Sequence, residues 1–228
     1  MIITIDGPSG SGKTTLALML AKKLNFFCLS SGYLYRGLAY VLKKVYHYNA
    51  ERMKKPDQKD IHAVFQNGQL RYEYQAGLIK MFWVEDITYQ VKDVEIAKFA
   101  ALLAQNEVVR SCIKKYENNL IAGKNVVVEG RACGSVWHPD AALKIYLDAS
   151  VDVRAARLQQ DQMKRGNVVL LHEAKQLVIA RDGLDRTRTI DPLVVPEGAV
   201  VLDSSTLVVG DVLEQAFELV AKIEQPNS

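Results

Sequence analysis

The sequence has few cysteines, no long apolar run and almost no excess charge. Its three cysteines lie far apart along 228 residues, and none forms a CxxC pair. The four histidines are also scattered, so no group of cysteines and histidines has the spacing of a zinc site. A small, odd number of separated cysteines is typical of reduced thiols. We therefore expect neither a disulfide framework nor a zinc site.

Charge and hydropathy argue against two further classes of protein. Twenty-nine basic and 26 acidic residues leave a net charge of +3, which is too small to predict binding to a nucleic-acid polymer. No apolar run is long enough to cross a bilayer, and the first residues lack the basic leader of a secretory signal. We expect a cytoplasmic protein without membrane or nucleic-acid partners.

Strand-like and helix-like segments alternate along most of the chain. Short apolar runs typical of buried strands occupy residues 1–6, 26–30, 125–131, 142–149 and 198–205. Helical periodicity marks residues 13–24, a segment after a turn at 30–32, and residues 94–116, 151–164, 172–185 and 209–223. This alternation predicts an α/β fold, in which helices cover both faces of a parallel sheet.

Residues 48–88 interrupt this alternation. Leu70, Tyr72 and Tyr74 alternate with polar neighbours, and the pair Ala76–Gly77 separates them from a second apolar run. Two such runs around a two-residue turn with glycine predict an antiparallel hairpin. We interpret the segment as a small inserted lobe, and the aromatic faces of its hairpin as packing surfaces.

A glycine-rich segment, GPSGSGKT at residues 7–14, matches the pattern GxxxxGK[ST] between a predicted strand and a predicted helix. Its backbone N–H groups and the start of the helix favour phosphate oxygens. Lys13 is expected to reach the β- and γ-phosphates, and the Thr14 hydroxyl to hold Mg²⁺. The residues expected to bind the nucleoside triphosphate are Gly7, Pro8, Ser9, Gly10, Ser11, Gly12, Lys13, Thr14 and Thr15. The pattern leaves the phosphoryl acceptor open.

Arginines near element ends favour a phosphorylated acceptor. The chain has no N-K-x-D stretch of a GTPase, and its strand VVVEG ends in a single Glu129 rather than in the paired acids of an ATPase motor. Two roles stay open for Glu129: it could order the water shell of a metal, or it could be a structural carboxylate at the end of the strand. A guanidinium grips phosphate bidentately, so many arginines suit two phosphorylated molecules held end to end. These arginines are Arg36, Arg110, Arg131, Arg154, Arg157, Arg165, Arg181, Arg186 and Arg188.

Longer motifs occur in a fixed order along the chain. ITIDGPSGSGKTT opens it, LSSGYLYRGLA follows, and VEGRACGSVWHPDAALKIYLDAS lies beyond the middle. VRAAR, ARDGLDRTRTIDPL and VVLDSS complete the series. In this order the motifs resemble those of the bacterial cytidylate kinases, which are nucleoside monophosphate kinases. The resemblance extends over nearly the whole chain.

This resemblance implies a domain organisation and a reaction. The fold would be a P-loop NTPase-type parallel sheet flanked by helices, with its core at about 1–38 and 108–228. A monophosphate-binding lobe with the hairpin would occupy about 39–107, and a short lid about 154–190. The protein would transfer the γ-phosphoryl group of ATP to CMP or dCMP with Mg²⁺, acting as a monomer.

The resemblance also implies roles in an acceptor pocket. Ser31 and Arg36 would line the monophosphate pocket, with Arg36 on the substrate phosphate. Arg110 and Arg131 would face the nucleotide, near its base or its phosphate.

Further residues would hold the acceptor and assist the transfer. Arg181 and Arg188 would contact the acceptor phosphate, and Asp185 would accept hydrogen bonds from the sugar hydroxyls. Arg154 and Arg157, on the lid, would approach the transferring phosphoryl group. The residues expected to act in the transfer are Lys13, Arg131, Arg154, Arg157 and Asp185.

The chain departs from the family pattern at three informative positions. Ser30 and Ala132 stand where the family usually has aspartate, and Lys92 stands where it usually has arginine. The aspartate expected at position 132 helps to read the base in the family, and alanine cannot form a hydrogen bond through its side chain. We therefore expect a relaxed or altered base preference.

Two alternatives to this reaction stay open. One is a P-loop kinase of another small acceptor, such as UMP, shikimate or dephospho-coenzyme A. The other is a nucleotide-binding regulatory protein with impaired catalysis, an alternative that Ala132 and Lys92 keep open, whereas Lys13 and Thr14 argue against it.

Overall fold

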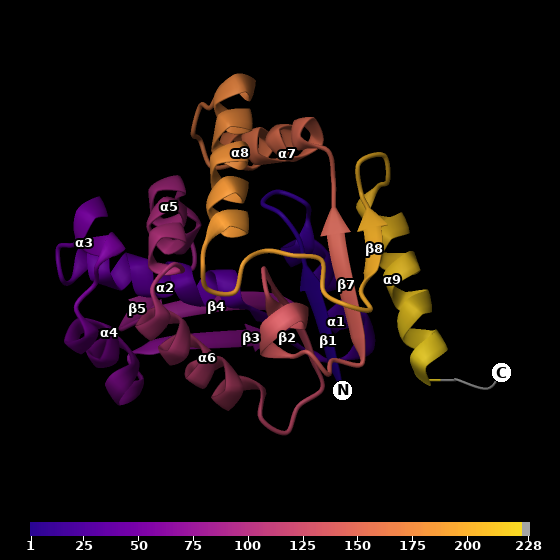
Figure 1. The fold of residues 1–228 in the computed structure, drawn as a ribbon, viewed down its shortest axis with the longest axis horizontal. Coiled ribbons are helices and arrows are strands. Elements are labelled where there is room, and N and C mark those ends of the chain that lie inside the picture. Colours follow the sequence, from indigo (N-terminus) through magenta and orange to yellow (C-terminus); the bar gives the residue numbers. More distant parts are fainter. Residues whose placement is uncertain (225–228) are drawn as a thin grey trace.

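A parallel five-stranded sheet forms the centre of the computed structural model, which describes residues 1–224 (Figure 1). The strands lie in the order β2-β6-β1-β7-β8, and each pairs in parallel with its neighbours. Their bounds are β1 (Ile2–Asp6), β2 (Phe27–Ser30), β6 (Val126–Gly130), β7 (Leu143–Asp148) and β8 (Val200–Asp203). The prediction of an α/β fold with a parallel sheet is confirmed.

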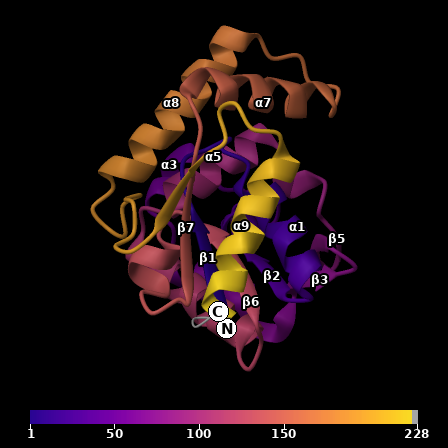
Figure 2. The ribbon, with the colours of Figure 1, turned by 90° about the vertical axis from the view of Figure 1, so that its right-hand side faces the viewer.

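Helices cover the sheet. On one face α1 (Lys13–Leu24) packs beside α9 (Val209–Glu224), and Figure 2 shows the two helices together in front of the strands. α7 (Val151–Met163) and α8 (Leu171–Thr187) pack against each other beyond the carboxyl ends of the strands (Figure 1). The other main helices are α2 (Ser31–Lys44), α5 (Val94–Leu103) and α6 (Glu107–Ile121). Strand β6 is fully buried, as its run of valines predicts.

The predicted hairpin is present as β3 (Leu70–Gln75) and β4 (Leu78–Trp83), with β5 (Glu85–Asp86) beside β4. Ala76 and Gly77 both have positive φ, 54° and 79°, as a tight two-residue hairpin turn requires. The Tyr72 hydroxyl donates to the Cys28 carbonyl oxygen (2.9 Å) and accepts from the Ser30 amide (3.0 Å). The hairpin face therefore packs against the end of β2, in agreement with its interpretation as a packing surface.

The structure differs from the sequence expectation in two segments. The single helix expected at 94–116 is two helices: α5 ends at Leu103, and Asn106 caps the start of α6 by accepting from the Val109 amide (3.1 Å). The polar stretch before the hairpin forms two short helices, α3 (Ala50–Lys54) and α4 (Gln58–Phe65). Asn49 and Asp57 cap these helices with their side chains. Short polar side chains thus cap the starts of α3, α4 and α6, and apolar periodicity alone revealed neither the two short helices nor the break before α6.

Asp6, at the carboxyl end of β1, holds the π-helical turn η3 (Cys133–Trp137) in place. Its carboxylate is fully buried and accepts from the backbone amides of Cys133 (2.9 Å) and Gly134 (2.7 Å).

Replacement Asp6→Ala would leave both amides without this acceptor. We expect it to lower the free energy of unfolding by about 2–5 kcal/mol in urea titrations.

Two variants serve as controls for this prediction. Asp6→Asn keeps one carbonyl acceptor, so it is expected to be less destabilising than alanine. Asp140→Ala removes an exposed carboxylate from the same region and is expected to change the free energy by less than about 0.5 kcal/mol. An Asp6→Ala protein as stable as Asp140→Ala would contradict the structural role of Asp6.

Candidate active site

The loop between β1 and α1 forms the cradle that the glycine pattern predicts. It leaves the carboxyl end of β1 at the edge of the sheet that α7 and α8 overhang (Figure 1). Gly7 has a φ of +148°, and a Cβ there would lie 2.0 Å from the Leu147 carbonyl oxygen. Only glycine fits this close approach to β7.

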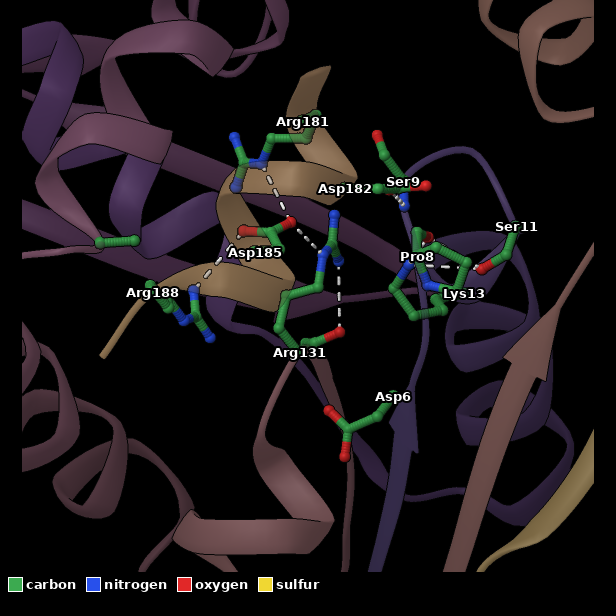
Figure 3. Close-up of polar contacts among 12 residues, drawn as sticks. Asp6, Pro8, Ser9, Ser11, Lys13, Arg131, Arg181, Asp182, Asp185 and Arg188 are labelled. Atoms are coloured by element: carbon green, nitrogen blue, oxygen red, sulfur yellow. Dashed lines mark hydrogen bonds and ion pairs between the residues drawn. The ribbon is translucent and has the colours of Figure 1, made fainter. Parts of the chain in front are cut away.

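Lys13, the first residue of α1, lies in this cradle with its ammonium group buried. Its Nζ donates to the Pro8 carbonyl oxygen (2.6 Å) and lies 3.3 Å from the Ser11 hydroxyl (Figure 3). Burial, assisted by the positive charge of Arg131, lowers the pKa of Lys13 to about 7. A bound phosphate would oppose both effects, so the cradle is prepared for an anion.

The Thr14 hydroxyl lies beside a buried carboxylate. It donates to Glu129 Oε1 (2.9 Å), and the Ser30 hydroxyl donates to the same oxygen. Magnesium in nucleotide sites is held by one or two protein oxygens together with phosphates and water. Thr14 and Glu129 fit that donor set. Within residues 1–224 no cluster of three or more His, Cys, Asp or Glu residues could hold a metal, which such a magnesium site does not require.

Asp185 on α8 organises a cluster of arginines (Figure 3). Its Oδ2 accepts from Arg131 Nε (2.8 Å) and Arg181 Nε (3.1 Å), and its Oδ1 lies 3.5 Å from Arg188 Nη1. Burial acts to raise the pKa of Asp185, but the three guanidinium groups outweigh it and hold the pKa below its usual range. The carboxylate keeps the three cations close together and leaves them with an excess of positive charge.

One cleft of about 730 Å³ connects the cradle with these arginines. Its lining includes most of the residues predicted from the sequence to bind the two nucleotides. From the cradle these are Ser9, Gly10, Gly12, Lys13, Thr14 and Thr15. From the remainder of the chain they are Ser31, Arg36, Arg110, Arg131, Arg157, Arg181 and Arg188. Segments distant in sequence thus meet in one polar cavity.

Arg154 and Asp182 contact the cradle backbone at Ser9, and neither residue lines the cleft. Arg154 Nη1 binds Asp182 Oδ2 (2.5 Å) and the Ser9 carbonyl oxygen (3.0 Å), and its Nε donates to the Ala149 carbonyl oxygen (2.9 Å). Asp182 Oδ1 accepts from the Ser9 amide (3.0 Å). In this arrangement Arg154 supports the cradle backbone, and its expected approach to the phosphoryl group stays a prediction. Gly7, Pro8, Ser11 and Asp185 also contribute from outside the lining.

All three departures from the family pattern line the cleft. Ser30 donates to Glu129, a contact that a second carboxylate could not make without repulsion. Lys92 lies beside Arg165, whose Nη1 donates to the Lys92 carbonyl oxygen (2.6 Å), and burial together with Arg165 lowers the pKa of Lys92. Ala132 is buried and presents only a methyl group.

The structure adds aromatic side chains to the site that the sequence analysis did not select. Tyr35 and Trp137 line the cleft near Arg110, with ring centroids 5.9 and 5.3 Å from its guanidinium carbon. Tyr35 adjoins Arg36 in the motif LSSGYLYRGLA, so its position beside a predicted ligand was the available signal. Trp137 belongs to a variable position of its motif and gave no such signal.

None of the helices among residues 1–224 has both the length and the apolar character needed to cross a bilayer.

Two comparisons of the sequence identify one family, and a comparison of structures supports the fold. A family model described as Cytidylate kinase matches residues 3–222. The chain is 37% identical over 225 residues to a cytidylate kinase from Chlamydia caviae, which covers 97% of this chain and 98% of the relative. It is 36% identical over 220 residues to a cytidylate kinase from Thermotoga petrophila, with 96% of each chain covered. A crystal structure of an uncharacterized protein from Eubacterium ventriosum shares the fold, with a TM-score of 0.51, 12% identity and coverage of 97% and 98%.

Proposed function

The chain belongs to the cytidylate kinase family and is a nucleoside monophosphate kinase, and on this premise we propose that it transfers the γ-phosphoryl group of ATP to CMP or dCMP. The products would be ADP and CDP or dCDP. The observation that carries this proposal is the shared cleft, in which a phosphate cradle and an arginine cluster face one cavity. We propose the same division of the chain as from the sequence, with a monophosphate-binding lobe at 39–107 and a lid at 154–190.

The transfer would be direct. A phosphate oxygen of the acceptor attacks the γ-phosphorus, and the bond to the β–γ bridging oxygen breaks, so that its electron pair leaves with ADP. The acceptor phosphate is already a nucleophile, and the demand on the protein is positioning and positive charge. Lys13 and Arg157 would stabilise the transferred group, because Lys13 lies in the cradle and Arg157 lines the same cleft. Arg36, Arg131, Arg181 and Arg188 line the cleft and would hold the acceptor phosphate. Asp185, which pairs with three of these arginines from outside the lining, would accept from the sugar hydroxyls.

Magnesium would be held by the Thr14 hydroxyl, with Glu129 ordering its water shell, and would neutralise charge on the phosphates. The hydrogen bond from Thr14 to Glu129 supports this pairing. Ser30 keeps Glu129 oriented by donating to the same oxygen.

We propose that the base preference is relaxed. Ala132 lines the cleft near Arg110 and Trp137, where a carboxylate could accept from the exocyclic amine of cytosine, a group that uracil lacks. Replacement Ala132→Asp is therefore expected to raise the CMP-over-UMP ratio of kcat/KM. The expected gain is about 5- to 150-fold, equivalent to about 1–3 kcal/mol for one base contact.

The assay combines protein, ATP and Mg²⁺ with CMP, dCMP, UMP, AMP or GMP, and measures ADP. Ala142→Asp adds the same charge at an exposed position and is expected to leave the ratio unchanged. A wild-type preference for CMP that Ala132→Asp does not sharpen would contradict the relaxation. ADP formed with none of the monophosphates would favour the regulatory alternative, and ADP with shikimate or dephospho-coenzyme A alone would favour another acceptor.

A further inference from the structure

Asp191, in the turn after α8, joins three segments beside the cleft. Its Oδ2 accepts from Arg110 Nε on α6 (2.7 Å) and from the Trp137 indole nitrogen on η3 (3.0 Å), and Arg110 Nη2 lies 2.5 Å away. Its backbone carbonyl oxygen accepts from Arg188 Nε (2.7 Å). One residue therefore fixes two arginines that line the cleft, one through its side chain and one through its backbone.

Arg110 is held on several sides but keeps free donors. Its Nη1 donates to the Ala104 carbonyl oxygen (3.2 Å), and its side chain is only 6% exposed. A guanidinium has five N–H groups, of which these contacts use three. One N–H on each terminal nitrogen stays available to a ligand in the cleft. Two neighbouring donors of this kind recognise paired acceptor atoms on a base edge.

Asp191 is the carboxylate that pairs with the buried Arg110 guanidinium. The lining of the cleft also includes Ala100, Ala104 and Ala132, which carry no charge, and Arg188, whose charge repels that of Arg110. Burial acts to raise the pKa of Asp191, but the Trp137 hydrogen bond and the charge of Arg110 outweigh it and keep this pKa below its usual value. Asp191 is thus an anion that compensates the buried guanidinium, and it does so without itself lining the cleft.

We infer that Asp191 is a positioning residue for recognition of the acceptor base, and that it holds Arg110 in the orientation in which its two free N–H groups meet the base. The inference rests on the proposed function, because it assigns the base of the monophosphate to this part of the cleft. Asp191 gives Arg110 a carboxylate partner outside the lining of the cleft, whereas Ala132, within the lining, offers none.

Backbone geometry decides which variants test this role. Asp191 has a φ of 47°, in the left-handed region that glycine and asparagine tolerate better than other residues. Asp191→Gly removes the carboxylate without backbone strain. Asp191→Asn keeps the size and one acceptor oxygen but removes the charge. Asp140→Ala removes an exposed carboxylate from a neighbouring loop and is the matched control.

The experiment measures KM for CMP and for ATP, and also the Kd of CMP from the fluorescence of Trp137 in a Trp83→Phe background. Asp191→Gly is expected to raise KM and Kd for CMP by about 10- to 100-fold and KM for ATP by less than about twofold. Asp191→Asn is expected to produce a smaller increase, and Asp140→Ala none. A merely structural role would change both substrates and the melting temperature together.

Two results would overturn the role of Asp191, and a third would refute only the proposed function. Unchanged CMP parameters in Asp191→Gly would overturn the inference while leaving the proposed function intact. Equal increases in KM for CMP and ATP would also overturn it. A wild-type protein that binds CMP but forms no ADP would refute the proposed function alone, because the fluorescence titration still decides the role of Asp191.

Discussion

Replacement Asp185→Ala is expected to destabilise the protein by about 3–5 kcal/mol, because it would leave three crowded arginines without their shared buried carboxylate. Asp185 is 2% exposed and contacts Arg131, Arg181 and Arg188. Activity should fall as well, since the three guanidinium groups would separate and no longer converge on one phosphate. We expect kcat/KM for CMP to decrease by about 10²-fold or more.

Urea titration and steady-state kinetics separate these two effects. Asp185→Asn keeps the shape and one acceptor but removes the charge, so it is expected to lose less stability than alanine. A high concentration of sulfate or phosphate should recover part of the stability of Asp185→Ala, because the anion would pair with the exposed cations. An alanine variant with wild-type stability and wild-type KM for CMP would show that the cluster does not depend on Asp185.

Lys13→Met is expected to lower kcat by about 10²- to 10³-fold, the usual effect of removing one preorganised group that stabilises developing charge. Methionine fills a similar volume without an ammonium group, so the cradle should keep its fold. Lys22→Met removes an exposed lysine from the same helix and is expected to leave kcat unchanged. A similar kcat for Lys13→Met and the wild type would refute the role of Lys13 in the transfer.

The lowered pKa of Lys13 predicts that ATP binding depends on pH. Its pKa in the ligand-free protein is about 7, whereas a bound triphosphate would raise it toward the ordinary range. At a pH about one unit above 7, most of the free protein has a neutral Lys13 and must take up a proton when ATP binds. The apparent affinity for ATP should therefore fall as pH rises through this window.

Calorimetry in buffers of different ionisation enthalpy measures this proton uptake. It should approach one proton per ATP above pH about 7, decline below it, and be absent in Lys13→Met. Because the pKa of Lys13 is lowered in the folded protein, the unfolded chain binds more protons than the folded one between about pH 7 and the ordinary lysine pKa of 10.5. The contribution of Lys13 to stability therefore rises with pH in this range. ATP binding without proton uptake at any pH would contradict the prediction.

Local and regular signals in the sequence were sufficient for the sheet and the cradle. The β-branched run of β6, the glycine pattern at residues 7–14 and the Ala76–Gly77 turn each act over a few residues, and each is present as predicted. Motif order supplied the family, which composition and periodicity alone could not reach.

Contacts between residues distant in the sequence could not be predicted from such local signals. Nothing in the segment around Asp191 indicates that its carboxylate meets Arg110, because the two residues are on different segments that only the folded chain brings together. Arg154 matches a motif by position, yet its side chain lies behind the cradle, where Asp182 and Ser9 engage it. Sequence could select these residue types, but their partners are set by packing.

The ties between Arg154, Asp182 and Ser9 have a mechanical consequence for the pair of helices above the cleft. A swing of α7 and α8 as one rigid body would pull Asp182 from the Ser9 amide and disturb the cradle itself. A movement of α7 and α8 that leaves the cradle intact must therefore occur at their other end, where Arg165 contacts Lys92. The near end of the pair is therefore fixed to the cradle, and we expect any opening of the cleft to begin at the end where Arg165 contacts Lys92.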